Sequence, residues 1–190
     1  MRIRFSLRIL GLLLMIFSST MIFPMLISLS ENGHTAFTFL NSLALTFSSG
    51  LLLWLTSSGP KQELRIRDGF LITSLFWCVL GCFGSLPFYL SDALDLTLIE
   101  SIFESISGLT TTGATVITGL DELPKSILFY RQFLQWLGGI GIIVVAVAIL
   151  PMLGIGGMQL YKVETPGPSK DSKIAPRITE TAKALFLVYL

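Results

Sequence analysis

Four long runs without a single charged residue constrain this sequence more than any other feature. They cover residues 9–30, 32–60, 69–91 and 132–161, and each is 22 to 30 residues long. About 20 apolar residues in a helix cross the hydrocarbon core of a bilayer. Only 13% of the chain is charged, against roughly 25% in soluble domains. The sequence therefore predicts an all-α integral membrane protein.

The positions of the basic residues predict how the chain is oriented in the membrane. Eleven of the 13 lysines and arginines lie at the N-terminus, between the second and third runs, and after the fourth. The other loops hold Lys125 and Arg131 together with seven acidic residues. By the positive-inside rule, the N-terminus is cytoplasmic and the regions around residues 31–35 and 92–131 lie outside. Four crossings satisfy this pattern, with the first run retained as a transmembrane helix rather than cleaved as a signal peptide.

The ends of the expected helices follow from turn and proline signals. We expect two leading transmembrane helices over residues 7–29 and 36–55, with a kink at Pro24, joined by a tight turn at residues 31–34. A third helix is expected over residues 69–90. The fourth run is rich in glycine, which suits either close helix packing or a hinge.

A different pattern fills the stretch between the third and fourth runs. Thr97 followed by Glu100 is typical of a capping box, and Gly108 is a natural helix stop. The helix between them has about 12 residues and a length of about 18 Å, which is too short to span a bilayer. A surface helix would carry basic residues, whereas this one carries Glu100 and Glu104. We expect both glutamates to be solvated, and the alternative is that they line an outer vestibule. The pattern favours a re-entrant half-helix, and hence one helix–pore-loop–helix repeat.

The half-helix leads into a neutral strip rich in threonine and glycine. Its centre is Thr110-Thr111-Thr112-Gly113-Ala114-Thr115. A dehydrated cation needs a ring of oxygen ligands, which backbone carbonyls supply in potassium filters, and glycine permits the backbone geometry that such a strip requires. The strip is therefore a candidate selectivity filter, and a packed polar loop is the alternative.

The sequence contains no motif that is typical of an enzyme active site or of a cofactor site. His34 is the only histidine and is expected to be solvated; Cys78 and Cys82 are expected to act as small buried hydrophobes. No phosphate-binding loop and no Ser–His–Asp set can be assembled. We therefore expect no enzyme activity, no cofactor and no nucleic-acid partner.

Three longer motifs carry a family resemblance. SGLTTTGAT, FYRQFLQWLGGIGI and LPMLGIGGMQLY all lie within residues 103–168. They resemble the TrkH-like membrane subunits of Trk-type potassium-uptake systems, and the similarity extends over essentially the whole chain. It implies four helix–pore-loop–helix repeats around one pore. By position, Gly113 would be the filter glycine of the first repeat, Thr111 and Thr112 would supply carbonyl ligands for potassium, and Thr110, Ala114 and Thr115 would flank them.

The resemblance also implies an assembly. It implies potassium uptake across the cell inner membrane, a homodimer, and a cytosolic nucleotide-binding regulatory subunit. Residues 1–60 would form an N-terminal helix pair, 61–161 the first repeat, 162–178 a cytoplasmic connector, and 179–190 the start of the next repeat. The chain would be an N-terminal fragment that supplies one of four strips and would not conduct alone. The rival interpretation is a non-conducting helical scaffold or assembly subunit, and a membrane enzyme is a distant third.

Overall fold

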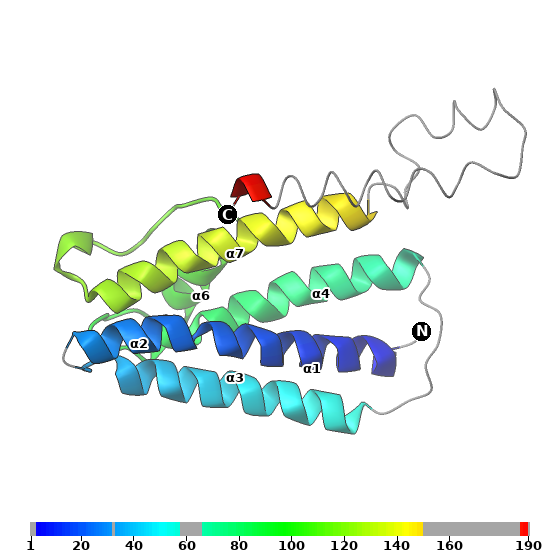
Figure 1. The fold of residues 1–190 in the computed structure, drawn as a ribbon, viewed down its shortest axis with the longest axis horizontal. Coiled ribbons are helices and arrows are strands. Elements are labelled where there is room, and N and C mark those ends of the chain that lie inside the picture. Colours follow the sequence, from blue (N-terminus) through cyan, green and yellow to red (C-terminus); the bar gives the residue numbers. More distant parts are fainter. Residues whose placement is uncertain (1–2, 32, 58–65, 150–186, 190) are drawn as a thin grey trace, which may run out of the picture. The chain divides into compact units, whose positions relative to one another are not determined.

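Every secondary-structure element in the described part of the chain is a helix. The computed structural model describes residues 3–31, 33–57, 66–149 and 187–189 (Figure 1). The elements, in order, are α1 (Ile3–Thr20), α2 (Ile22–Ser30), α3 (Ala36–Thr56), α4 (Ile66–Gly84), α5 (Leu86–Tyr89), α6 (Leu98–Leu109), the 3-10 turn η1 (Leu120–Glu122) and α7 (Lys125–Ile149). The chain forms two compact units, Met1–Trp136 and Leu137–Leu190. The first unit holds α1 to α6 and the start of α7.

The two leading helices agree with the prediction of two initial crossings. Within the described residues, Ser6–Ser30 and Ala36–Thr56 are the stretches that are long and apolar enough to span a bilayer. Both expose large apolar side chains, such as Leu12, Phe37 and Leu52. Side chains of this kind are suited to contact with lipid tails.

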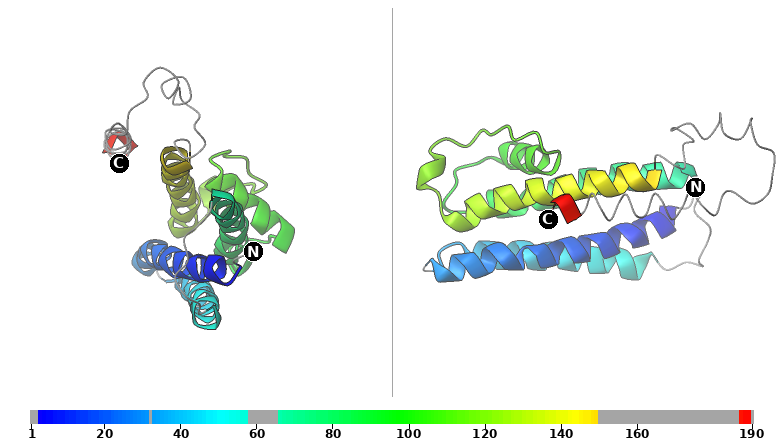
Figure 2. Two further views of the ribbon diagram at one scale, coloured as in Figure 1. Left: turned by 90° about the vertical axis from the view of Figure 1, so that its right-hand side faces the viewer. Right: turned by 45° about the horizontal axis from the view of Figure 1, so that its top comes forward.

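Two glycines let α1 and α3 pack backbone against backbone. The helices lie side by side along their length (Figure 2). A Cβ built on Gly11 would lie 2.6 Å from the carbonyl oxygen of Gly50, and a Cβ on Gly50 would lie 2.8 Å from that of Gly11. Such distances exclude any side chain without a shift of the helices, so the pair acts as a small-residue contact of the kind that membrane helices use.

Prolines divide two of the expected helices. The first breaks at Met21, three residues before Pro24, because a proline ring clashes with the carbonyl group four residues earlier. The third breaks at Ser85, two residues before Pro87. The helix expected from residue 132 begins seven residues earlier, at Lys125, and continues to Ile149. Its predicted end, the connector at residues 162–178 and most of residues 179–190 lie outside the described residues.

A buried polar cluster fixes the start of α7 to the turn between α2 and α3. The Thr35 hydroxyl donates to Ser28 Oγ at 2.8 Å and pairs with Ser126 Oγ at 2.7 Å. The Ser126 N–H donates to Glu31 Oε2 at 3.3 Å. One turn further along α7, the Tyr130 hydroxyl is fully buried and donates to the carbonyl oxygen of Gly84 at 2.9 Å. These contacts hold the first turns of α7 against the end of α4 and the α2–α3 turn, and they set the position of the residues that face α6.

Candidate functional site

The short helix α6 begins and ends close to where the sequence predicts. Thr97 and Glu100 form the expected capping box. The helix has 12 residues and ends at Leu109, one residue beyond the predicted stop. Gly108 lies inside the helix, where a Cβ would be 3.1 Å from Leu134 Cβ. The glycine therefore allows α6 to approach α7 closely, and the helix is terminated by the residues that follow.

The polar face of α6, and not its apolar face, is buried. Ser101, Glu104, Ser105 and Ser107 are buried, whereas Leu98, Ile99, Phe103 and Ile106 are exposed. The buried face packs against α4, where a Cβ on Gly84 would lie 2.6 Å from Ser105 Oγ. An orientation of this kind suits a helix whose outer side meets apolar surroundings.

A tight turn closed by two backbone hydrogen bonds, one nested inside the other, ends α6. The Thr112 N–H donates to the Ser107 carbonyl oxygen at 3.0 Å, and the Thr111 N–H donates to that of Gly108 at 2.9 Å. This is the Schellman pattern, in which the residue after the C-cap takes a left-handed conformation and is usually glycine. Here that residue is Thr111, with φ of 57°. Gly113 follows with φ of 74°, and its N–H also reaches the Ser107 carbonyl oxygen, at 3.3 Å.

All six candidate filter residues lie together in one exposed strip that leaves the end of α6. Residues 110–115 are exposed, and the Ser107 hydroxyl donates to the Ala114 carbonyl oxygen at 2.6 Å. Within the described part of the chain, no hydrogen bond is directed at the carbonyl oxygens of Thr110, Thr111, Thr112 or Gly113. The strip thus has four consecutive carbonyl groups without a hydrogen-bond donor among the described residues.

The groups that could bind a metal by side-chain ligation are not gathered at this site. No group of three or more His, Cys, Asp or Glu side chains that could hold a metal ion occurs among the described residues. The oxygen atoms that residues 110–115 themselves offer are main-chain carbonyl and threonine hydroxyl oxygens. Such neutral oxygen ligands are those that potassium filters use.

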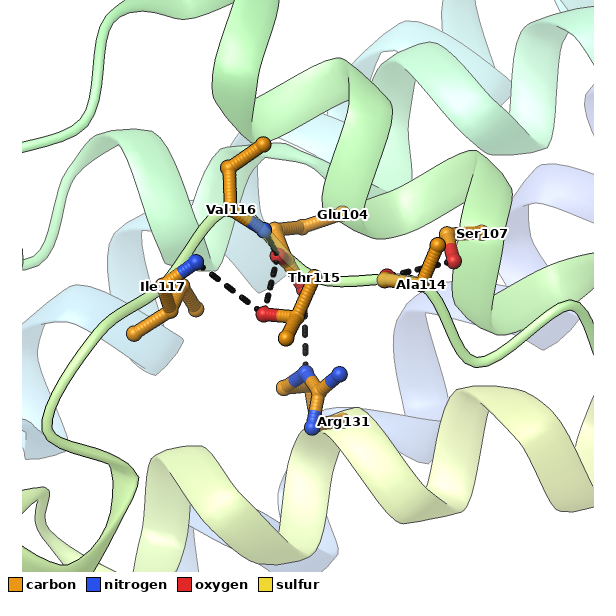
Figure 3. A network of polar contacts seen from close by, with 7 residues as sticks. All are labelled: Glu104, Ser107, Ala114, Thr115, Val116, Ile117 and Arg131. Carbon is orange, nitrogen blue, oxygen red and sulfur yellow. Dashed lines mark hydrogen bonds and ion pairs between the residues drawn. The ribbon is translucent and has the colours of Figure 1, made fainter.

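Glu104 fastens the strip to the protein behind it (Figure 3). Its Oε1 accepts hydrogen bonds from the Thr115 hydroxyl at 2.5 Å and from the Val116 N–H at 2.6 Å. Its Oε2 accepts from Arg131 Nε of α7 at 2.9 Å. The Thr115 hydroxyl in turn accepts from the Ile117 N–H at 3.0 Å. One carboxylate therefore joins the strip to both α6 and α7.

The burial of Glu104 corrects the interpretation of the two glutamates as solvated. The side chain of Glu104 is 0% exposed and that of Arg131 is 10% exposed. Only Glu100 remains near solvent, where hydrogen bonds from the Thr97 hydroxyl and N–H hold its pKa below the usual value. One feature of the sequence could have indicated the Glu104–Arg131 ion pair, because Arg131 is one of only two basic residues in the predicted outer loops.

The remaining candidates play no part in the site. His34 is exposed, as expected. Cys78 and Cys82 are free thiols and are exposed on α4, so the expectation that they are buried is wrong. Both lie on the part of α4 that follows the charged residues, where thiols can face apolar surroundings at little cost.

The comparisons with known proteins give a consistent family. The family model TrkH, described as a cation transport protein, matches residues 35–190. The chain is 60% identical over 189 residues to the Trk system potassium uptake protein TrkH of Halomonas elongata, and 57% identical over 190 residues to that of Vibrio parahaemolyticus. Each alignment covers 100% of this chain and 39% of the relative, so the chain spans about two fifths of the length of these curated relatives.

A solved structure supports the fold over the same range. The crystal structure of the potassium transporter TrkH from Vibrio parahaemolyticus superimposes with a TM-score of 0.81 at 52% sequence identity. The match covers 100% of this chain and 37% of that one. The all-helical architecture is therefore shared with the solved relative.

Proposed function

Because the chain belongs to the TrkH family of cation transport proteins, we propose that it forms part of a potassium-uptake protein and supplies one strip of its selectivity filter. Thr111, Thr112 and Gly113 are the proposed potassium-binding residues, with Thr110, Ala114 and Thr115 as flanks. Potassium would be the transported ion and not a resident cofactor. The relatives are potassium uptake proteins of Trk systems, which supports a transport role rather than an enzymatic one.

The run of unpartnered carbonyl groups carries this proposal. Four consecutive carbonyl oxygens, from Thr110 to Gly113, accept no hydrogen bond within the described residues, while the strip on either side is bonded to α6. Carbonyl oxygens of this kind can replace the water shell of potassium. The strip has no charged residue that would trap the ion. It also begins at the C-terminal end of α6, where the helix dipole favours a cation.

The proposed function places the chain in a larger assembly. Residues 1–60 would form a helix pair, 61–161 the first helix–pore-loop–helix repeat, 162–178 a cytoplasmic connector and 179–190 the start of the next repeat. The N-terminus would be cytoplasmic in a multi-pass protein of the inner membrane, as the basic residues favour. Three further strips would come from the rest of the protein.

The proposed partners follow from the family resemblance. They are the lipid bilayer, a second copy of the full-length protein in a homodimer, and a cytosolic nucleotide-binding regulatory subunit. The rival function, a non-conducting scaffold, would leave the carbonyl groups of the strip without a role.

A chimera with a matched pair of substitutions tests the proposal. The 190 residues would replace the matching part of the Halomonas elongata relative, and growth of an uptake-deficient strain on limiting potassium would be measured. Gly113→Asp should abolish growth, since a carboxylate in the strip would trap cations. The control is Gly119→Asp, which is exposed and has a similar φ of 69°, with no atom within 4 Å of an added Cβ. Gly119→Asp should grow as wild type.

Two results would count against the filter. If Gly113→Asp supports normal growth, the strip does not line the ion path. If both variants insert normally on immunoblots and lose growth to the same extent, the effect is not specific to Gly113. Either result would favour the scaffold interpretation.

A further inference from the structure

We propose that the buried carboxylate of Glu104 is a positioning residue that sets the ion selectivity of the strip. This inference rests on the proposed function and concerns the same site. Glu104 would not touch the ion. It would act through the Thr115 hydroxyl and the Val116 N–H, and Arg131 would hold the carboxylate in place (Figure 3).

Three donors converge on this one carboxylate. The Thr115 hydroxyl and the Val116 N–H approach Oε1, and Arg131 Nε approaches Oε2. An ionised carboxylate only accepts hydrogen bonds, so it satisfies all three donors at once. An amide in its place would present an NH₂ group to at least one of them.

The unpartnered carbonyl groups lie between two points of attachment. On the side of α6, the N–H groups of residues 110–113 donate to carbonyl oxygens in the last turn of the helix, at Ile106, Ser107 and Gly108. On the other side, the Ser107 hydroxyl holds the Ala114 carbonyl oxygen, and Glu104 holds the next two residues. Loss of the second attachment would let the strip tilt its carbonyl groups. Selectivity between potassium and sodium depends on the number and placement of such oxygens, so discrimination should fall before transport does.

The role of Arg131 is to keep the buried charge in place. A buried carboxylate needs a paired charge, and removal of either partner leaves the other uncompensated. A single substitution at either position would therefore release the strip and also destabilise the fold, because one charge would remain buried and unpaired. Paired substitutions that remove both charges separate the two effects.

Two neutral pairs make the decisive comparison. In Glu104→Gln with Arg131→Gln, the amide oxygen at position 104 can accept from both strip donors, and its NH₂ can donate to the amide oxygen at position 131. In Glu104→Leu with Arg131→Met, the charges are also removed but no acceptor remains. Both pairs are neutral and similar to each other in size, so they differ mainly in the attachment of the strip.

The experiment measures ion competition in the full-length chimera. Rubidium uptake by an uptake-deficient strain would be recorded with increasing external sodium, together with membrane insertion on immunoblots. The Gln–Gln pair should keep the selectivity of the wild type. The Leu–Met pair should insert normally but lose selectivity by about tenfold or more, because each hydrogen bond to a charged group is worth on the order of one factor of ten.

A second pair of variants covers the possibility that the Leu–Met protein does not insert. Thr115→Val removes one strip bond and leaves the Glu104–Arg131 pair intact, whereas Thr115→Ser retains the hydroxyl. Thr115→Val should lower selectivity by about tenfold, which is the lower end of the range for one hydrogen bond to a charged group, and Thr115→Ser should keep the selectivity of the wild type.

The outcomes separate this inference from the proposed function. Selectivity that is unchanged in Thr115→Val, or unchanged in an inserted Leu–Met protein, would overturn the role of Glu104. Equal loss in the Gln–Gln and Leu–Met pairs would also overturn it, because an acceptor would then not suffice. A wild-type chimera without potassium or rubidium flux would instead refute the proposed function itself.

Discussion

Because Thr111 has a left-handed conformation, substitution by glycine should have opposite effects on stability at Thr111 and at the neighbouring Thr112. Thr111 has φ of 57°, and it is the only residue other than glycine with positive φ among the described residues. Thr112 beside it has the same side chain, is also exposed, and has an ordinary φ. Substitution of each by glycine therefore tests the backbone geometry with a control built into the strip.

The magnitudes follow from the cost of the left-handed region. That region costs an L-residue about 1–2 kcal/mol, and a β-branched side chain is especially ill suited to it. Glycine removes this cost but adds about 0.5–1 kcal/mol of chain entropy to the unfolded state. Thr111→Gly should therefore be neutral or raise the free energy of unfolding by up to about 1.5 kcal/mol.

Thr112→Gly should instead be destabilising. The substitution adds the same conformational entropy to the unfolded chain, and it relieves no backbone strain because the φ of Thr112 is ordinary. It also removes the hydroxyl pair between Thr110 and Thr112, at 2.8 Å. We expect a loss of about 0.5–1.5 kcal/mol.

The assay is the apparent thermal midpoint of the detergent-solubilised chimera at one fixed scan rate. A change of 1 kcal/mol shifts the midpoint by about 2–4 °C in a chain of 150–250 residues, and by less in a longer one. Thr111→Gly should lie at or above the wild-type midpoint and Thr112→Gly below it. If Thr111→Gly lowers the midpoint as much as Thr112→Gly does, the left-handed turn at the end of α6 is not present in the protein.

Two other substitutions test the packing of the leading helices and the cap of α6. Gly50→Ala should lower the thermal midpoint, because its Cβ would lie 2.8 Å from the Gly11 carbonyl oxygen and such overpacking costs about 1–3 kcal/mol; Ser49→Ala, one residue earlier, should change it little, and equal shifts would contradict the close contact. Since hydrogen bonds from Thr97 hold the pKa of Glu100 low, the carboxylate stabilises the fold above its unfolded pKa, and this contribution is lost as pH falls through the folded pKa. The midpoint difference between wild type and Glu100→Gln should therefore narrow between about pH 5 and about pH 3, and a difference independent of pH would refute the cap.

Much of the described fold follows from local sequence signals. The length of the uncharged runs predicts the leading helices, and their bounds agree with α1 to α3 apart from the break at Met21 and a start at Ile3, four residues before the predicted one. Thr97 and Glu100 predict the start of α6 because a capping box depends on residues three apart. The assignment of residues 111–113 to an ion path stays a prediction.

Contacts between distant residues were beyond these local signals. Glu104 and Arg131 are 27 positions apart, and their pairing depends on how α6 packs against α7. Gly108 looks like a helix stop because glycine often ends helices, yet here it permits a close approach to Leu134. In both cases the sequence shows the residue type, while the tertiary arrangement decides its role.

The burial of Glu104 also follows from the surroundings of the protein. In water, an amphipathic helix buries its apolar stripe and exposes its charges. α6 does the opposite, with Ile99 and Phe103 exposed and Glu104 buried. Where the outer surface meets lipid, apolar side chains can face outwards, and ionisable groups turn towards a partner inside the protein. A glutamate on a half-length helix of a membrane protein is therefore better interpreted as one half of an ion pair, and an arginine on the next helix along the chain, such as Arg131, is the residue to pair with it.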